Sequence, residues 1–207
     1  MDPAPISLRP TLAPEDEARA EFYALLASLY GAPPSAGLLA ALGASELWPD
    51  EGDNPIASAW NALVLASRAM DAEAAEQEYT DLFIGVGKCE VNPHASHWIT
   101  GFMMEKPLAS LRSELAELNL ARQPGVTILE DHLAALFETM RVLITGAGSA
   151  PPAPIATQRG FFERQIGPWV FDCCTAIANS SVANYYLRVA QFSTLFLAVE
   201  RDSLAIQ

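Results

Sequence analysis

The sequence has few basic residues. Its 12 Lys and Arg stand against 25 Asp and Glu, which gives a formal net charge of -13. Proteins that bind nucleic acid need clustered cations to neutralise phosphates, so this composition argues against nucleic acid as a partner. An acidic surface favours a basic peptide or a basic protein surface instead, although acidity can also serve solubility alone.

Cysteine is scarce as well. Cys89, Cys173 and Cys174 form neither a disulfide framework nor a Cys-x-x-Cys pair. Reduced, buried thiols are therefore expected, as in a reducing cytosol. The sequence has no apolar run suited to spanning a bilayer, and residues 1–5 have neither the basic nor the apolar part of a secretory signal. We therefore expect a cytoplasmic protein without stable membrane insertion.

The alternation of apolar and polar residues that is typical of strands is also missing. Apolar residues recur instead at helical spacing, and the hydrophobic content of 51% is enough for a substantial core. We expect a single compact all-α domain over 14–207 that follows a loose lead-in over 1–13. Residues 145–158, rich in Gly, Ala, Ser and Pro, predict a hinge before the last helices. Such a hinge is compatible with a monomer or a domain-swapped dimer.

Local patterns predict several helix boundaries. Thr127 and Glu130 have the spacing of a capping box, so a helix is expected to begin there. Ser180 or Ser181 is expected to cap a last helix that runs to about residue 201. Pro168 should interrupt the helix predicted over 159–179.

The most unusual loop of the chain follows a helix predicted over 71–83. Gly85 and Gly87 tolerate a positive φ, so the chain can leave this helix sharply and its backbone can approach another molecule. Pro93, two histidines and Trp98 follow. We interpret this loop as one wall of a peptide-binding groove.

Catalytic and metal-binding motifs are not recognisable. Cys89, His94 and His97 have no known zinc spacing, and a fourth ligand such as His132 would have to come from elsewhere. The glycines have the wrong spacing for a phosphate loop, and a serine beside a histidine makes no triad. We predict no enzyme, metal or cofactor. A small-ligand switch protein, binding a metal or a nucleotide at the histidines, remains an alternative.

A short acidic cluster precedes the apolar run that begins at Leu133. Glu130 and Asp131, with His132, can accept hydrogen bonds from a guanidinium group. The local pattern is also typical of a helix start at which Glu130 completes a cap and Asp131 favours the helix dipole. The pattern alone favours that structural role.

Three separated blocks stand out for their order and spacing. They are Glu78-x3-Leu82-Phe83-x-Gly85-x-Gly87 followed by Pro93 and Ser96-x-Trp98; Asp131-His132; and Phe162-x5-Pro168-Trp169 followed by Tyr185-Tyr186. In combination they resemble the TorD/DmsD family of cytoplasmic chaperones for twin-arginine-exported redox enzymes. That family has Glu-Pro-x-Asp-His in the second block. Here Ile128 and Leu129 replace the Glu-Pro, and Gln165 replaces the family's histidine in the third block.

The resemblance implies an all-helical chaperone that binds the twin-arginine signal peptide, and part of the mature body, of a molybdenum-cofactor redox enzyme. It would assist cofactor insertion and prevent premature export. Asp131, with Glu130, would accept the two arginines. The alternative is a non-catalytic assembly subunit of a redox complex. The predicted signal-peptide-binding residues are Leu82, Phe83, Gly85, Gly87, Pro93, Ser96, Trp98, Phe102, Glu130, Asp131 and His132.

Overall fold

The computed structural model describes residues 12–49, 52, 54–85, 87–148 and 150–206, so most of the predicted lead-in over 1–13 lies outside the described residues. Within these ranges the chain is helical and contains no strand, which confirms the predicted all-α class. The elements are α1 (Pro14–Gly31), α2 (Ala36–Gly43), α3 (Pro55–Ala69), α4 (Ala72–Tyr79), the π-helical turn η1 (Thr80–Ile84), α5 (Ala95–Thr100), α6 (Lys106–Glu117), α7 (Leu133–Thr145), α8 (Ile155–Phe161), the π-helical turn η2 (Phe162–Ile166), α9 (Val170–Asn179) and α10 (Tyr185–Ile206).

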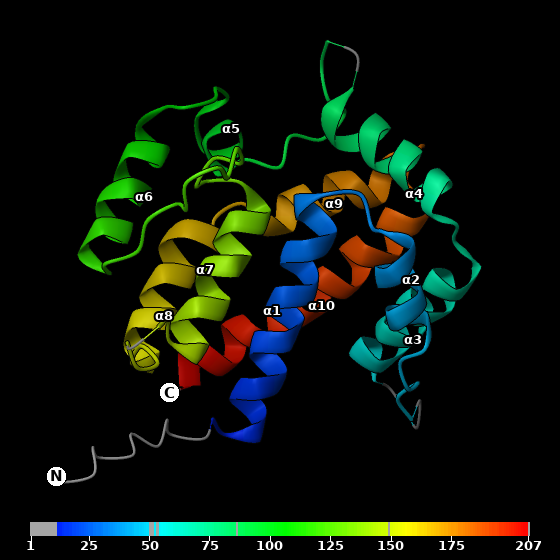
Figure 1. The fold of residues 1–207 in the computed structure, drawn as a ribbon, viewed down its shortest axis with the longest axis horizontal. Helices are drawn as coiled ribbons and strands as arrows, with labels where there is room; N and C mark the ends of the chain where they lie inside the picture. Colours follow the sequence, from blue (N-terminus) through cyan, green and yellow to red (C-terminus); the bar gives the residue numbers. More distant parts are fainter. Residues whose placement is uncertain (1–11, 50–51, 53, 86, 149, 207) are drawn as a thin grey trace, which may run out of the picture.

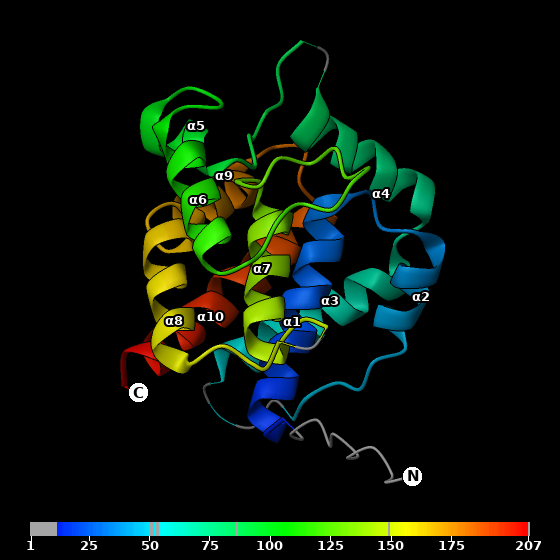
Figure 2. The same cartoon turned by 60° about the vertical axis from the view of Figure 1, so that its left-hand side comes forward.

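Helices α1 and α7 lie side by side at the centre, and the long α10 passes behind them (Figures 1 and 2). α3 and α9 pack against α10, and α2 packs on α3. α5 and α6 pair with each other at one side of the molecule. This arrangement leaves the start of α7 close to the segment that leads into α5.

Aromatic side chains join the central helices. The ring of Tyr30 lies 5.9 Å from that of Phe137 and 6.4 Å from that of Tyr186, which connects α1, α7 and α10. All three side chains are fully buried. Each such burial contributes roughly 1.5–3 kcal/mol, so the aromatic cluster is a main source of stability.

The predicted start of α7 at Thr127 is wrong. The helix begins at Leu133, and His132 is its N-cap, because the His132 Nδ1 atom accepts a hydrogen bond from the Ala134 N–H at 3.1 Å. Glu130 cannot complete a capping box in the preceding loop, since its carboxylate is bound by arginine side chains instead.

The predicted cap of the last helix is also wrong. α10 begins at Tyr185, and its first N–H groups are satisfied by the Glu78 carboxylate of α4. That carboxylate accepts hydrogen bonds from the N–H groups of Asn184 (2.8 Å), Tyr185 (3.0 Å) and Tyr186 (2.7 Å). The partner lies more than 100 residues away along the chain, so a local cap signal could not reveal it.

The predicted interruption at Pro168 is confirmed, since η2 ends at Ile166 and α9 begins at Val170. The predicted linker over 145–158 is too long, because α8 already begins at Ile155. The Ala153 N–H also donates to the Leu143 carbonyl at 2.7 Å, which ties the end of the linker back to α7. A hinge in this segment stays a prediction.

Candidate functional site

Main-chain hydrogen bonds hold the loop before α5 against the start of α7. The Leu133 N–H donates to the Pro93 carbonyl at 2.8 Å, and the Ala95 N–H donates to the Asp131 carbonyl at 2.9 Å. Between these two bonds, His94 and His132 face each other as an isolated antiparallel bridge. The sequence block that contains Pro93 and the block Asp131-His132 are therefore in direct contact.

Asp131 is the polar centre of this site, and only 1% of the residue is exposed. Its Oδ2 atom accepts hydrogen bonds from the Ser96 N–H at 3.1 Å and from the Ser96 hydroxyl. Its Oδ1 atom is buried and has no hydrogen-bond partner among the described residues. A buried acceptor without a donor costs about 1–3 kcal/mol, and more when it is charged. A ligand that brings a donor to Oδ1 would recover that free energy.

Two uncharged histidines border the carboxylate. The rings of His94 and His132 meet edge to face, with centroids 4.8 Å apart. Burial, followed by the proximity of His94, lowers the pKa of His132 to about 3. Burial likewise lowers the pKa of His94, against the opposing effect of Asp131. Neither imidazole supplies a positive charge to Asp131 at neutral pH.

Hydrogen bonds to Asn92 fix the orientation of the His94 and Trp98 rings. The Asn92 Oδ1 atom accepts from the His94 N–H at 3.1 Å, and the His94 Nδ1–H donates to the same oxygen at 2.9 Å. The Trp98 indole N–H donates to the Asn92 carbonyl at 2.7 Å, which holds Trp98 half-buried beside the loop. Asn92 was not among the predicted site residues.

Glu130 differs from its neighbour because it already has cationic partners. Its carboxylate forms ion pairs with Arg112 at 2.9 Å and Arg122 at 3.6 Å. Burial alone would raise the pKa of Glu130, but the hydrogen bonds and charge of Arg112, with the charge of Arg122, lower it overall. Neither arginine was predicted from the sequence, since each is several residues from Glu130 and no local motif links them.

A groove of about 610 Å³ lies next to Glu130. Most of its lining consists of small or aliphatic side chains from α1, α7 and the segment that connects α6 to α7. Glu130, Glu138 and Arg122 supply its charged groups. The lining residues are Ala24, Ala27, Ser28, Gly31, Leu115, Leu120, Ala121, Arg122, Gln123, Val126, Ile128, Glu130, Ala134, Ala135, Glu138, Thr139, Val142 and Ala147.

The two glycines of the loop between η1 and α5, Gly85 and Gly87, have different surroundings. Gly85 has a φ of 63°, and a Cβ atom there would lie 2.2 Å from the Lys88 carbonyl oxygen. Any side chain at this position would therefore disrupt the turn. Gly87 has a φ of 88°, but no described atom lies within 4 Å of its Cβ position. Gly85 shapes the loop, and Gly87 leaves its backbone accessible.

The predicted apolar contacts lie at different depths. Leu82 and Phe83 are buried in the core, where Phe83 packs against Tyr79 and Tyr186. They support the loop from beneath. Phe102 is instead exposed just beyond α5. The structure brings together Pro93, Ser96, Asp131 and His132, with Trp98 at their side.

Among the residues that the structure describes, no group of three or more His, Cys, Asp and Glu side chains is placed to hold a metal ion. No helix in the described part of the chain is both long and apolar enough to cross a membrane.

These features describe an all-helical protein with a buried carboxylate, one oxygen of which lacks a hydrogen-bond partner among the described residues. Residues 49–175 match the family model described as nitrate reductase delta subunit. The match covers more than half of the chain, from the connector before α3 into α9, so the chain belongs to the nitrate reductase delta subunit family. That family comprises TorD-like, non-catalytic chaperones for the maturation of molybdoenzymes. A search of curated proteins gives no match.

Proposed function

We propose that this chain is a cytoplasmic chaperone that binds the twin-arginine signal peptide of a molybdenum-cofactor redox enzyme. In this role it would assist cofactor insertion and delay export until the enzyme is loaded. Family membership supports a molybdoenzyme as the partner. The observation that supports an arginine-containing ligand is the buried Asp131 Oδ1 atom, which lacks a donor among the described residues.

A guanidinium group is the natural complement of this oxygen. It carries five N–H donors in a planar fork and stays charged at any physiological pH. The neighbouring His94 and His132 are neutral at pH 7, so they leave the charge of the carboxylate uncompensated. An arginine that reaches Oδ1 would supply both the missing donor and the missing charge.

The groove beside Glu130 suits the apolar stretch that follows the arginines in such a peptide. Its lining by Ala, Leu, Val and Ile side chains offers apolar contact. Burial of apolar surface contributes about 25 cal/mol per Å², so even a short aliphatic segment would gain substantial binding free energy there. Phe102, which is exposed just beyond α5, remains a predicted apolar contact.

Two linked measurements test this function. Isothermal titration calorimetry should give tight binding of a synthetic twin-arginine signal peptide and much weaker binding of the same peptide with both arginines changed to lysine. The tagged protein should also capture a molybdoenzyme precursor from its native cytosol, but not the same enzyme lacking its signal peptide. Equal capture of both forms would instead support an assembly subunit that binds the mature enzyme.

A further inference from the structure

The carboxylate of Glu130 is occupied by two arginines of the chain itself. The Arg112 Nε and Nη2 atoms both donate to the Glu130 Oε2 atom, at 3.1 and 2.9 Å. The Arg122 Nε atom lies 3.6 Å from the other oxygen, Oε1. Glu130 directly precedes Asp131, so a doubly bound acidic residue adjoins one that lacks a cation.

The exposure of the three side chains makes these ion pairs exchangeable. Arg112 and Arg122 are 50% and 37% exposed, whereas Glu130 is only 13% exposed. An arginine that is half in water contributes little through its ion pair and returns readily to solvent. The Glu130 carboxylate would then lose its partners at a largely enclosed position, which favours replacement by another guanidinium.

Helix α6 does not depend on the Arg112 contact for its position. Leu108, Leu111 and Leu115 are buried on its inner face. Glu114 also binds the Arg164 guanidinium at 2.7 Å and the Gln165 amide at 2.6 Å. Arg112 can therefore leave Glu130 while α6 stays in place.

We propose that Arg112 and Arg122 are specificity-determining residues, which occupy Glu130 until a ligand with two arginines displaces them. This inference rests on the proposed function. Consecutive Cα atoms lie about 3.8 Å apart both in the ligand and in this protein. Two adjacent arginines of a ligand can therefore bind the adjacent carboxylates of Glu130 and Asp131. A ligand with one arginine satisfies Asp131 but leaves the internal pairs intact. A lysine side chain lacks the planar, forked set of donors, so it is a poor substitute for the Arg112 guanidinium at Glu130.

The test measures peptide affinity in a double variant, Arg112→Gln/Arg122→Gln. Removing the internal competitors should tighten binding of the twin-arginine peptide about three- to tenfold, as expected for two exposed ion pairs. The matched control is Arg188→Gln/Arg201→Gln, which removes the same charge from arginines whose hydrogen-bond partners are Gln191 and Asp202. A gain in affinity no larger than that of the control, or a loss of affinity, would contradict the proposed displacement of Arg112 and Arg122.

Glu130→Gln shows whether the gain acts through this carboxylate. In the Glu130→Gln background the Arg112 and Arg122 substitutions should raise the peptide affinity no more than the control does, because residue 130 no longer carries a charge for which arginines compete. A gain that persists would place the competition elsewhere and contradict the proposal. Should the double variant fail to fold, Arg112→Gln alone poses the same question, because that arginine is half exposed.

The outcomes separate this inference from the proposed function. If neither the wild type nor the double variant binds the twin-arginine peptide, both are wrong. If both bind it with equal affinity, only the proposed displacement of Arg112 and Arg122 is wrong. A peptide with a single arginine provides the last comparison. Its affinity should change less than twofold between the two proteins, because it never displaces Arg112 and Arg122.

Discussion

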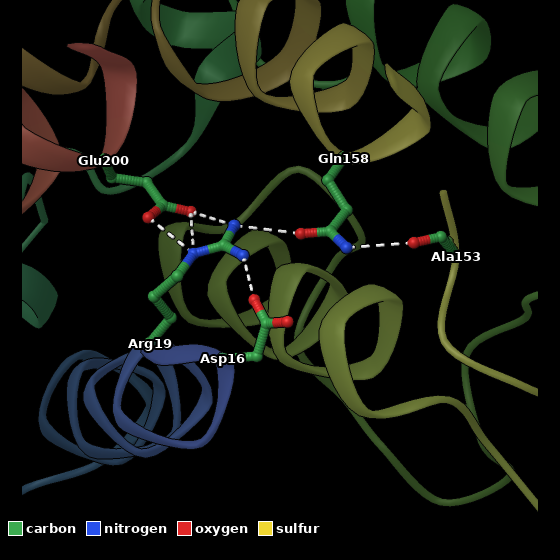
Figure 3. A network of polar contacts seen from close by, with 5 residues as sticks. All are labelled: Asp16, Arg19, Ala153, Gln158 and Glu200. Atoms are coloured by element: carbon green, nitrogen blue, oxygen red, sulfur yellow. Dashed lines mark hydrogen bonds and ion pairs between the residues drawn. The ribbon is translucent and has the colours of Figure 1, made fainter. Parts of the chain in front are cut away.

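Two buried carboxylates, Glu200 and Asp131, have very different surroundings. Glu200 on α10 is 2% exposed and is bound by the Arg19 guanidinium of α1, whose Nε and Nη2 atoms lie 2.9 and 2.7 Å from its oxygens. The same guanidinium also binds Asp16 at 2.6 Å and Gln158 of α8 at 2.9 Å (Figure 3). The amide nitrogen of Gln158 in turn donates to the Ala153 carbonyl.

Asp131 is equally buried but has no such network. One oxygen is held by Ser96, and the other lacks a partner among the described residues. A third buried carboxylate, Glu78, resembles Glu200 in being satisfied, since it accepts three N–H groups at the start of α10. A buried charge that only stabilises a fold is normally fully paired. Asp131 departs from this pattern, and the proposed binding of an arginine would complete its pairing.

The largest effect is expected when the satisfied network is broken. Arg19→Met should lower the free energy of unfolding by about 3–5 kcal/mol, because Glu200 would remain buried without its cation. Urea denaturation measures this change. The double variant Arg19→Met/Glu200→Gln should recover part of the loss. A cost below about 1 kcal/mol for Arg19→Met would show that the network is not structural.

The next effect concerns Glu78. Glu78→Ala should lower the free energy of unfolding by about 2 kcal/mol, since it removes the acceptor of three N–H groups at the start of α10. Glu76→Ala, an exposed position on the same helix, is the matched control. If both variants lose the same stability in urea denaturation, Glu78 is not the cap of α10.

A smaller and pH-dependent effect is expected from His132. Its pKa falls from an ordinary value of 6.5 to about 3 in the folded protein, so the unfolded chain binds more protons between these values. Stability should therefore fall as the pH falls below 6.5, by up to about 1.4 kcal/mol per pH unit. Denaturation between pH 7.5 and 5 measures this slope before most carboxylates titrate.

The variant His132→Asn isolates that contribution. Asparagine is a good N-cap, so the start of α7 should be kept while the titrating imidazole is removed. The variant should show a flatter dependence of stability on pH than the wild type. Identical slopes for the wild type and His132→Asn would assign the acid sensitivity to other groups.

The smallest change in stability is expected at the site itself. Asp131→Asn should alter the free energy of unfolding by less than about 1 kcal/mol, because the remaining amide oxygen still accepts from Ser96 and the unpartnered charge is gone. Urea denaturation, run beside the Arg19→Met variant, makes the comparison direct. A loss as large as that of Arg19→Met would make Asp131 a structural residue like Glu200.

The fold class and the helix faces could be predicted from the sequence, because helical periodicity is a local property. The buried positions Leu133, Leu136 and Phe137 of α7 are an example. The starts of α7 and α10 could not be predicted, since their caps use His132 and the distant Glu78 in place of the local capping signals. Local patterns fail where a tertiary contact supplies the cap.

The candidate site shows the same division. Asp131 and His132 were recognisable as a motif, and the loop with Pro93 and Ser96 was recognisable beside its glycines. The bond between Ser96 and Asp131 and the arginines at Glu130 depend on how distant segments meet. The unpartnered oxygen of Asp131 is likewise a property of packing, which no spacing of residues reveals.

The most direct test of the account is the affinity of a twin-arginine signal peptide for Asp131→Asn, measured by calorimetry beside the wild type. Asp202→Asn, an exposed aspartate paired with Arg201, is the matched control. We expect Asp131→Asn to lose about 2–5 kcal/mol of binding free energy, at least about thirtyfold in affinity, while Asp202→Asn loses little. Unchanged affinity in a folded Asp131→Asn variant would contradict the assignment of Asp131 as the arginine receptor.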